Sequence, residues 1–331
     1  MAIRSSDKAG TERASRIDDP GDDTSLFESH DPRMQALLET AARAAVGDTT
    51  ILLSGESGTG KNVLARQIHR WSLRYAGPFV VINCTTLPEQ LLENELFGHI
   101  RGAFTGAVSD RPGRLEAGDA GTVLFDEIAD LSPSLQSKFL RFVQEHSFER
   151  IGSNRKIILD VRILAASNGN LETEVAAGRF REDLYYRLGV VVLRLPPLRE
   201  RSQDIIPLAT GILRQVARRA NRPLLSLSAE AAAALISYRW PGNVRELHNA
   251  LERAVALARG EAIMLADLPE SIREPGYGTC VPAAPGTKLE DFEREYILRA
   301  LAEGRTFKEA AAKLGINVAT LWRKRKRYGI E

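Results

Sequence analysis

The sequence predicts an α/β protein: a parallel sheet covered on both faces by helices, then a small helical lid and a C-terminal all-α helix-turn-helix. Three observations predict this. Short apolar runs alternate with helical patterns along the central part of the chain. Strand signals fade after about residue 198, while helical patterns continue. A basic helical module ends the sequence.

Composition divides the 331 residues into five segments. Residues 1–26 are polar and are predicted to be a disordered tail, because they offer few apolar side chains to bury. The α/β subdomain is expected over 27–197 and the helical lid over 198–274. Glycines and prolines mark a linker over 275–286, and the helix-turn-helix follows over 287–331.

Positive charge is concentrated at the C-terminal end of the chain. Residues 288–331 contain 11 Lys and Arg against 7 Asp and Glu, whereas the whole chain has a formal net charge of only +2. This placement favours an anionic polymer as partner. A solvated basic tail is the alternative.

Neither a membrane segment nor a disulfide framework is expected. No run of about 18 apolar residues is present to span a bilayer, and the first ten residues lack the apolar core of a signal peptide. We therefore expect a cytoplasmic location and no membrane partner. Cys84 and Cys280 have no Cys or His neighbours at metal-ligand spacing, so both are interpreted as reduced thiols.

A glycine-rich stretch between a buried strand at 50–53 and a helix from about residue 63 predicts a phosphate loop. Glycines allow close backbone approach, so that successive N–H groups point at phosphate oxygens at a helix N-terminus. A lysine adds positive charge, and the next position usually carries Ser or Thr for Mg²⁺, where this chain has an asparagine. The nucleotide-binding candidates are Gly55, Glu56, Ser57, Gly58, Thr59, Gly60, Lys61 and Asn62. A chance glycine-rich turn is the alternative.

Two acidic residues end the apolar strand predicted at 122–127. Asp126 is the candidate ligand of Mg²⁺, and Glu127 is the candidate base that polarises the attacking water. Without the phosphate loop, both would be interpreted as caps of a helix beginning near Ile128. A third strand, at 161–167, ends in Asn168, whose amide is a candidate for orienting the same water or for forming a turn. Together these motifs predict an ATPase that uses ATP and Mg²⁺.

The lid region contains helical patterns at 229–237 and 244–257, separated by Trp240-Pro241-Gly242-Asn243. Asn243 is predicted to cap the second helix. Arg245 then lies in the first turn, which is unfavourable for a cation unless a phosphate faces it, so it is a candidate nucleotide sensor. A surface salt bridge is the alternative.

These motifs, in this order, resemble the AAA+ domain of bacterial enhancer-binding proteins, the activators that work with the sigma-54 form of RNA polymerase. The resemblance covers about residues 27–272 and rests on GESGTGK, Asn83-Cys84, ELFGH at 95–99, GAFTGA at 102–107, LFDE at 124–127, FREDLYYRL at 180–188 and WPGNVREL at 240–247. It implies an ATPase that remodels sigma-54 polymerase, forms a hexamer and is a dimer when inactive.

The resemblance also assigns residue roles. It implies that Asn83 is a switch holding the catalytic glutamate, that Asn168 is a sensor, and that Arg181 and Arg187 are arginine fingers. Such fingers must enter a neighbouring subunit's site, so isolated subunits should hydrolyse ATP poorly. Taken alone, both arginines would be interpreted as ordinary members of a charged helix.

The GAFTGA hexapeptide is the most specific part of the resemblance. It implies that a surface loop contacts the sigma factor, mainly through its Phe and Thr: Gly102, Ala103, Phe104, Thr105, Gly106 and Ala107. Phe104 is a lone aromatic among small residues and is expected to be exposed, whereas without the family it would be interpreted as a buried anchor. Residues 150–156 resemble a second, supporting loop. The family usually carries Glu where this chain has Ile100. The coupling between ATP hydrolysis and the position of the loop is therefore expected to run through other residues.

The C-terminal module predicts three helices, at 289–302, at 306–314 with Thr306 as N-cap, and from about Val318. It is similar to the Fis-type domain. The third helix is expected to enter the major groove of double-stranded DNA, with Ala311, Leu314, Ile316 and Leu321 buried. The DNA-contact candidates are Asn317, Thr320, Arg323, Lys324, Arg325, Lys326 and Arg327. A three-helix protein-docking module is the alternative.

The combined expectation is a sigma-54-dependent transcriptional activator that binds enhancer DNA and remodels the closed polymerase complex into the open complex. The alternative is a DNA-binding regulator whose ATPase has lapsed or only senses ATP. An ATPase of another AAA+ branch with a different target is a third hypothesis. Only about 26 residues precede the predicted ATPase, so the activator is expected to be active whenever expressed or restrained by a separate protein in trans.

Overall fold

The computed structural model describes residues 29–85, 87–273, 294, 297, 298, 300, 301 and 306–328. The chain divides into two compact units, Met1–Pro275 and Gly276–Glu331, and each is described by itself. The predicted tail at 1–26 and the predicted linker at 275–286 lie outside the described residues.

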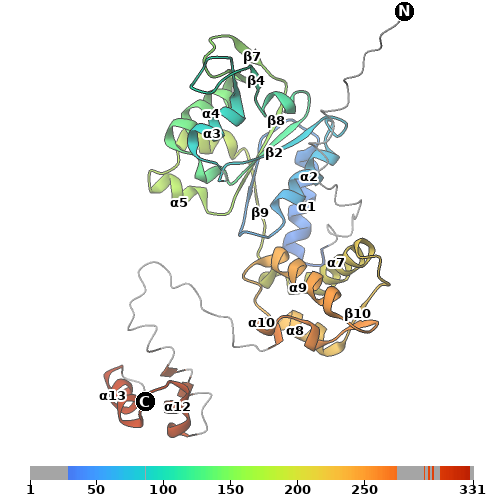
Figure 1. Ribbon diagram of the computed structural model, residues 1–331, viewed down its shortest axis with the longest axis vertical. Coiled ribbons are helices and arrows are strands. Elements are labelled where there is room, and N and C mark those ends of the chain that lie inside the picture. Colours follow the sequence, from blue (N-terminus) through green and yellow to red (C-terminus); the bar gives the residue numbers. More distant parts are fainter. Residues whose placement is uncertain are drawn as a thin grey trace, which may run out of the picture. The chain divides into compact units, whose positions relative to one another are not determined.

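Five parallel strands form the main sheet, in the order β2-β5-β8-β1-β9 (Figure 1). Their bounds are β1 Ile51–Ser54, β2 Phe79–Asn83, β5 Thr122–Asp126, β8 Arg162–Ser167 and β9 Val191–Arg194. The three strands predicted at 50–53, 122–127 and 161–167 are confirmed, each to within about a residue. Because the strands are parallel, the residues that follow β1, β5 and β8 meet at one edge of the sheet.

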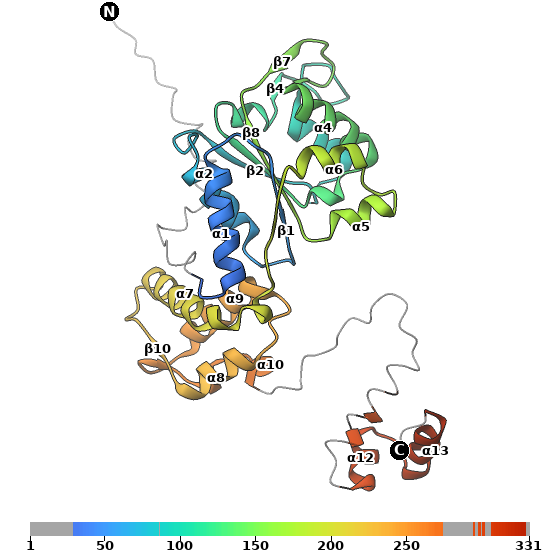
Figure 2. The same cartoon turned by 180° about the vertical axis from the view of Figure 1, so that it is seen from behind.

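Helices cover both faces of this sheet, as predicted (Figures 1 and 2). One face packs against α1 Pro32–Ala45 and α2 Lys61–Trp71, and the other against α3 Glu89–Phe97, α4 Pro133–Glu145, α5 Leu171–Ala176 and α6 Glu182–Leu188. The strands are apolar on both sides: Leu124 packs toward α1 and α2, whereas Val123 and Phe125 pack toward α3 and α4. Two short antiparallel pairs, β3 Gly98–His99 with β4 Arg111–Pro112 and β6 Ser147–Glu149 with β7 Lys156–Ile158, complete this subdomain, and Phe148 of β6 is buried in the core beside α3 and α4.

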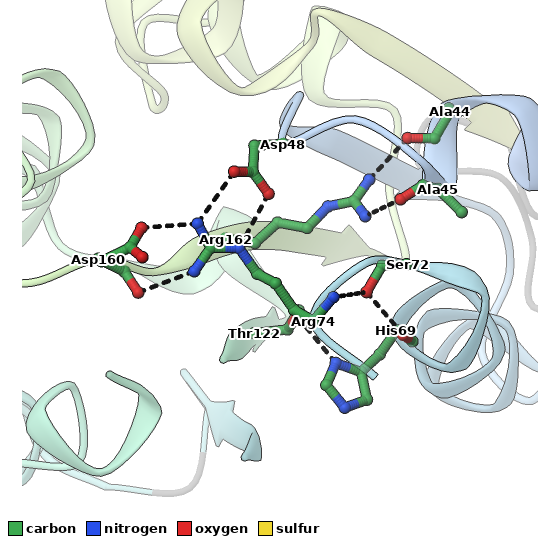
Figure 3. A network of polar contacts seen from close by, with 9 residues as sticks. All are labelled: Ala44, Ala45, Asp48, His69, Ser72, Arg74, Thr122, Asp160 and Arg162. Carbon is green, nitrogen blue, oxygen red and sulfur yellow. Dashed lines mark hydrogen bonds and ion pairs between the residues drawn. The ribbon is translucent and has the colours of Figure 1, made fainter. Parts of the chain in front are cut away.

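A polar network fixes α1 to the opposite edge of the sheet from the phosphate loop (Figure 3). Arg162, only 1% exposed, donates to the carbonyl oxygens of Ala44 and Ala45 at the end of α1. Beside it, Arg74 bridges the carboxylates of Asp48 and Asp160. The last carbonyl groups of a helix have no hydrogen-bond partner within the helix. Water does not reach them at this buried position, so the guanidinium of Arg162 supplies the donors.

The lid is a separate helical layer with its own core. It consists of α7 Ile205–Arg219, α8 Ala229–Ser237, α9 Asn243–Leu257, α10 Glu270–Arg273 and the small parallel pair β10 Ser226–Leu227 and β11 Ala262–Ile263. The predicted helices at 229–237 and 244–257 are confirmed. Trp240 is fully buried in this core and donates its indole N–H to the Leu235 carbonyl oxygen.

Asn243 does not cap α9, contrary to the prediction. Gly242 occupies the N-cap position, and Asn243 is the first helical residue, with a left-handed φ of 52°. Its fully buried amide instead accepts a hydrogen bond from Leu198 N and donates to the Glu56 carboxylate and to the Ser57 carbonyl oxygen. Asparagine tolerates a left-handed backbone conformation better than most residues. In this conformation the Asn243 side chain joins the lid to the phosphate loop instead of capping α9.

The C-terminal unit contains α12 Phe307–Lys313 and α13 Val318–Arg327, and residues 294, 297, 298, 300 and 301 are also helical. Thr306 Oγ1 accepts from Glu309 N, which confirms the predicted N-cap. Ala311 and Leu321 are buried, and Leu314 and Ile316 are partly buried against the same small core. None of the described helices is long and apolar enough to cross a bilayer.

We predict that Asn243→Ala lowers the free energy of unfolding of the ATPase unit by about 2–4 kcal/mol, because the substitution leaves the buried N–H of Leu198 unpaired and removes two partly buried hydrogen bonds to the phosphate loop. Urea denaturation followed by circular dichroism measures this change. Asn221→Ala is the matched control, since Asn221 has a similar φ of 50° but is exposed. The control should cost about 1 kcal/mol, and equal losses in the two variants would attribute the effect to backbone strain alone.

Candidate functional site

The phosphate loop lies between β1 and α2, where the sequence places it. Gly58 and Gly60 have φ of 79° and 105°, values that favour glycine. At Gly58 a Cβ atom would also lie 2.3 Å from the carbonyl oxygen of Gly242 in the lid. The loop therefore needs this glycine to accept the lid, in addition to any need for close approach to phosphate.

Lys61 begins α2 and folds back over the loop. Its side chain is largely buried, and its Nζ donates to the carbonyl oxygens of Gly55 and Glu56 at 2.8 and 3.2 Å and to the Asn168 amide oxygen. Burial lowers the pKa of Lys61, and the carboxylates of Glu127 and Asp126 oppose that shift. The structure thus brings the predicted phosphate-binding cation next to both predicted acidic residues.

Asp126 ends β5 and faces the start of α2. The Asn62 amide nitrogen donates to an Asp126 carboxylate oxygen at 2.7 Å. Sequence analysis considered only the amide oxygen of Asn62 as a metal ligand, whereas here its N–H₂ group faces the carboxylate. Rotating the amide by half a turn would present the oxygen instead.

Glu127 occupies the N-cap position of the short 3₁₀ turn Ile128–Asp130 with a left-handed φ of 57°, but its side chain makes no capping hydrogen bond. Its carboxylate accepts a hydrogen bond from Asn168 N at 3.0 Å. Burial raises the pKa of Glu127, while Lys61 and the Asn168 hydrogen bond oppose the shift. A carboxylate with a raised pKa in a polar cluster has the electrostatics of a general base.

Asn168 therefore joins two predicted site residues. Its amide oxygen binds Lys61, and its backbone N–H binds Glu127. Asn83 ends β2 and lies opposite Asp126 in the sheet register. The Asn83 amide oxygen accepts from the backbone N and hydroxyl of Thr85 at 2.9 and 2.6 Å. All four predicted residues, Asn83, Asp126, Glu127 and Asn168, thus lie at the same edge of the sheet.

The lid contacts the phosphate loop at several further points. Arg245 donates to the Ser57 hydroxyl at 2.8 Å, and the backbone N of Val244 donates to the Gly58 carbonyl oxygen at 2.9 Å. Arg199 binds the Glu56 carboxylate with both terminal nitrogens. This ion pair and a hydrogen bond from Asn243 lower the pKa of Glu56. Sequence analysis missed Arg199 and the linking role of Asn243, since no local pattern indicates a contact across more than 140 residues.

The two predicted arginine fingers differ in their surroundings. Arg181 forms a two-point ion pair with Asp183 and also donates to Ser137, so it is engaged within its own subunit. Arg187, in the last turn of α6, is exposed and has no hydrogen-bond or ion-pair partner among the described residues. Of the two, Arg187 could bind a group outside its own chain without first breaking an ion pair.

The hexapeptide 102–107 closes into a small loop through a hydrogen bond from Gly102 N to the Ala107 carbonyl oxygen. Phe104 is 43% exposed, and its ring meets the edge of His99 with 5.0 Å between centroids. His99 is itself held by Asn94 in α3 at 2.6 Å. The predicted exposure is found, but Phe104 also rests on an anchored ring.

The predicted second loop supports the first. Ile100 N donates to the Ile151 carbonyl oxygen, and Ile151 N donates to that of Gly98, so the bases of the two loops are joined. Arg150 forms a two-point ion pair with Glu116, which raises the pKa of Arg150 and lowers that of Glu116. The Glu116 carboxylate therefore stabilises the second loop, whereas Ile100 offers no carboxylate to the first loop.

The predicted DNA-reading helix α13 presents its basic residues on more than one face. Asn317 caps the helix by accepting from Thr320 N at 2.7 Å. Arg323, Lys326 and Arg327 are exposed, whereas the Arg325 guanidinium lies over the Phe307 ring of α12. The exposed side of α13 also carries Trp322, which sequence analysis did not include.

Comparison with known proteins identifies the parts of the chain. Residues 27–194 match the "Sigma-54 interaction domain" family, 199–279 the "AAA+ ATPase lid domain", and 288–328 the "Bacterial regulatory protein, Fis family". Alginate biosynthesis transcriptional regulatory protein AlgB of Pseudomonas syringae pv. tomato is 48% identical over 304 residues, covering 92% of this chain and 67% of AlgB. Transcriptional regulatory protein ZraR of Escherichia coli is 46% identical over 294 residues, covering 88% and 66%.

Among solved structures, NtrX from Brucella abortus in complex with ADP superimposes with a TM-score of 0.68 at 34% identity, over 91% of this chain and 68% of NtrX. A complex of the same protein with ATP gives the same TM-score. The AAA+ fold, the lid and the Fis-type helix-turn-helix predicted from sequence are thereby confirmed, and the chain belongs to the family of sigma-54-dependent transcriptional regulators.

Proposed function

We propose that this chain is a DNA-binding activator that hydrolyses ATP in a ring of subunits and uses the energy to remodel the closed complex of sigma-54 polymerase into the open complex. The observation that carries the proposal is the half-exposed Phe104, held at the tip of a loop whose base is joined to a second loop. A lone aromatic ring in this position suits contact with a partner protein. Such a DNA-binding regulator would act in the bacterial cytoplasm.

At the ATPase site, Lys61 would place its charge against the β- and γ-phosphates, and the N–H groups of the loop would bind their oxygens. Glu127 would accept a proton from the attacking water, and Asn168 would hold Glu127 in place through its backbone N–H. Arg245, already at Ser57, would contact the phosphates from the lid side.

The oxygen ligands at this edge fit Mg²⁺, which takes one or two protein oxygens together with phosphate and water. Asp126 would supply a carboxylate oxygen, and Asn62, with its amide rotated, a second oxygen. When bound with ATP, Mg²⁺ neutralises charge on the phosphates. Among the described residues, no group of three or more His, Cys, Asp or Glu is placed to hold a metal by itself, so binding would depend on the nucleotide.

Ring assembly, as a hexamer from inactive dimers, would bring an arginine from the adjacent subunit to each site. Arg187 suits this role better than Arg181, because Arg181 is paired with Asp183 in its own subunit. The coupling of hydrolysis to Phe104 would run through the joined loop bases and the Glu116–Arg150 pair, since Ile100 carries no charge.

The C-terminal unit would bind double-stranded enhancer DNA through α13. Arg323 and Lys326 are exposed and suit base-edge or phosphate contacts, and Thr320 lies in the first turn. Arg325 would contribute mainly by packing on Phe307. Binding through several phosphates should weaken steeply as salt rises.

One observation favours a second candidate function, a DNA-binding regulator that binds ATP without hydrolysing it. The hydrogen bond from Asn62 occupies the carboxylate that would otherwise face Mg²⁺. If this hydrogen bond persists with ATP bound, it would engage one of the two Asp126 carboxylate oxygens and weaken metal binding. Both candidates bind nucleotide and DNA, so binding does not distinguish them. Turnover of ATP does.

We predict that Phe104→Ala reduces open-complex formation on a sigma-54 promoter by about thirtyfold or more, since it removes a central aromatic contact. ATP hydrolysis should change by less than about twofold, because Phe104 touches no residue of the nucleotide site. Permanganate footprinting and phosphate release measure the two activities. Val108→Ala is the control, since Val108 is an 82% exposed neighbour outside the hexapeptide. Equal losses in both variants would refute a specific role for Phe104.

We predict an acid limb in the pH profile of kcat/KM for ATP, with a midpoint above the ordinary glutamate pKa of 4.5. Burial raises the pKa of Glu127, and only its ionised form accepts a proton, so the rate should fall as pH drops through this raised pKa. Glu127→Gln should lower turnover at least about a hundredfold and leave a residual rate without this limb. A limb with the same midpoint in Glu127→Gln would exclude Glu127 as the base.

A further inference from the structure

Arg201 is a buried arginine that belongs to the start of the lid but contacts the phosphate loop. It is 5% exposed, and its Nη2 donates to the Thr59 carbonyl oxygen at 2.9 Å. Its Nε is also buried and has no hydrogen-bond partner within the described structure. Burying a guanidinium with an unpaired N–H is costly, so its contact with the loop calls for an explanation beyond packing.

The contact fixes one peptide of the phosphate loop. A trans peptide is planar, so its C=O and N–H groups point in opposite directions. By holding the Thr59 carbonyl oxygen, Arg201 therefore sets the direction of the Gly60 N–H, one of the donors available to phosphate. Thr59 is itself 2% exposed and donates its hydroxyl to the Glu56 carbonyl oxygen, so this peptide has little other freedom.

Asp204 connects Arg201 to the segment that leads into α1. Its backbone N donates to the Arg201 carbonyl oxygen, and its carboxylate, 1% exposed, accepts from the Ser29 hydroxyl and from His30 N, both at 2.6 Å. Burial lowers the pKa of Arg201, and the carboxylates of Asp204 and Asp31 oppose that shift. Asp31 in turn caps α1 by accepting from Arg33 N and Met34 N. The segment Ser29–Asp31, here called the leading segment, thus sets the charges around Arg201.

We propose that Arg201 is a positioning residue for the nucleotide, and that the leading segment controls it through Asp204. A protein or domain that displaces Ser29 and His30 would free the Asp204 carboxylate, shift Arg201 and weaken nucleotide binding. Binding of a protein or domain to the leading segment would therefore regulate the affinity of the phosphate loop for nucleotide. The inference rests on nucleotide binding at the phosphate loop and not on polymerase remodelling.

The first test measures the ADP affinity of Arg201→Lys in the full chain by isothermal titration calorimetry. Lysine keeps the charge but loses the forked donor that reaches Thr59. The ADP Kd is expected to rise about tenfold, and the KM for ATP to rise with little change in kcat. Arg222→Lys is the matched control, because Arg222 also donates to backbone carbonyls, those of Val255 and Ala258, but within the lid. It should lower the melting temperature without changing the ADP Kd.

The second test addresses the leading segment. Ser29→Ala should raise the ADP Kd about threefold, and this effect should vanish when Arg201→Lys is already present, because Ser29 acts through Arg201. Thr40→Ala is the control: it removes an exposed hydrogen bond within α1, to the Ala36 carbonyl oxygen, and leaves the leading segment and Asp204 untouched, so the Kd should stay constant.

Three results would overturn the proposal. An unchanged ADP Kd in Arg201→Lys with a lowered melting temperature would show a purely structural role. Additive effects of Ser29→Ala and Arg201→Lys would show that the leading segment acts by another route. A wild-type chain that fails to bind ADP would refute nucleotide binding itself, an outcome distinct from a chain that binds ADP but does not remodel polymerase.

Discussion

The structure depends on one constraint: the phosphate loop is held from two sides, by the edge of the sheet and by the lid. From the sheet, Asn168 binds Lys61 through its side chain and Glu127 through its backbone. From the lid, Asn243 binds the Glu56 and Ser57 region of the loop. These contacts hold the loop and its charged groups together, and Lys61 would exchange its hydrogen bonds to the loop carbonyls for phosphate oxygens when nucleotide binds.

This constraint also explains why the lid carries so many polar groups at its contact with the sheet domain. Arg199, Arg201 and Asn243 each bind an atom of the loop, and two of them are buried. Buried polar groups are stabilising only when their partners are in place. A shift of the lid would therefore leave several of them unpaired at once, so the position of the lid and the shape of the phosphate loop should change together.

Sequence reasoning predicted most of the fold, because the strands at the candidate site are short apolar runs with a polar residue at or just after the end, such as Asp126 and Asn168. It failed where a contact links distant segments. Asn243 was expected to cap its own helix, by local rules, but tertiary contacts with Glu56 and Leu198 determine its conformation. Likewise, a basic run does not reveal that Arg325 packs on Phe307 while its neighbour Lys326 lies exposed.

The most direct test of the proposed ring ATPase is to mix two variants that should each be inactive, Arg187→Ala and Glu127→Gln, and to measure ATP hydrolysis. In mixed rings, a Glu127→Gln subunit would offer its Arg187 to the intact Glu127 of an Arg187→Ala neighbour. Random mixing in equal amounts should then restore about a quarter of the wild-type rate, since half the sites keep Glu127 and half of their neighbours keep Arg187. A mixture no more active than its two components would contradict a catalytic site shared between subunits.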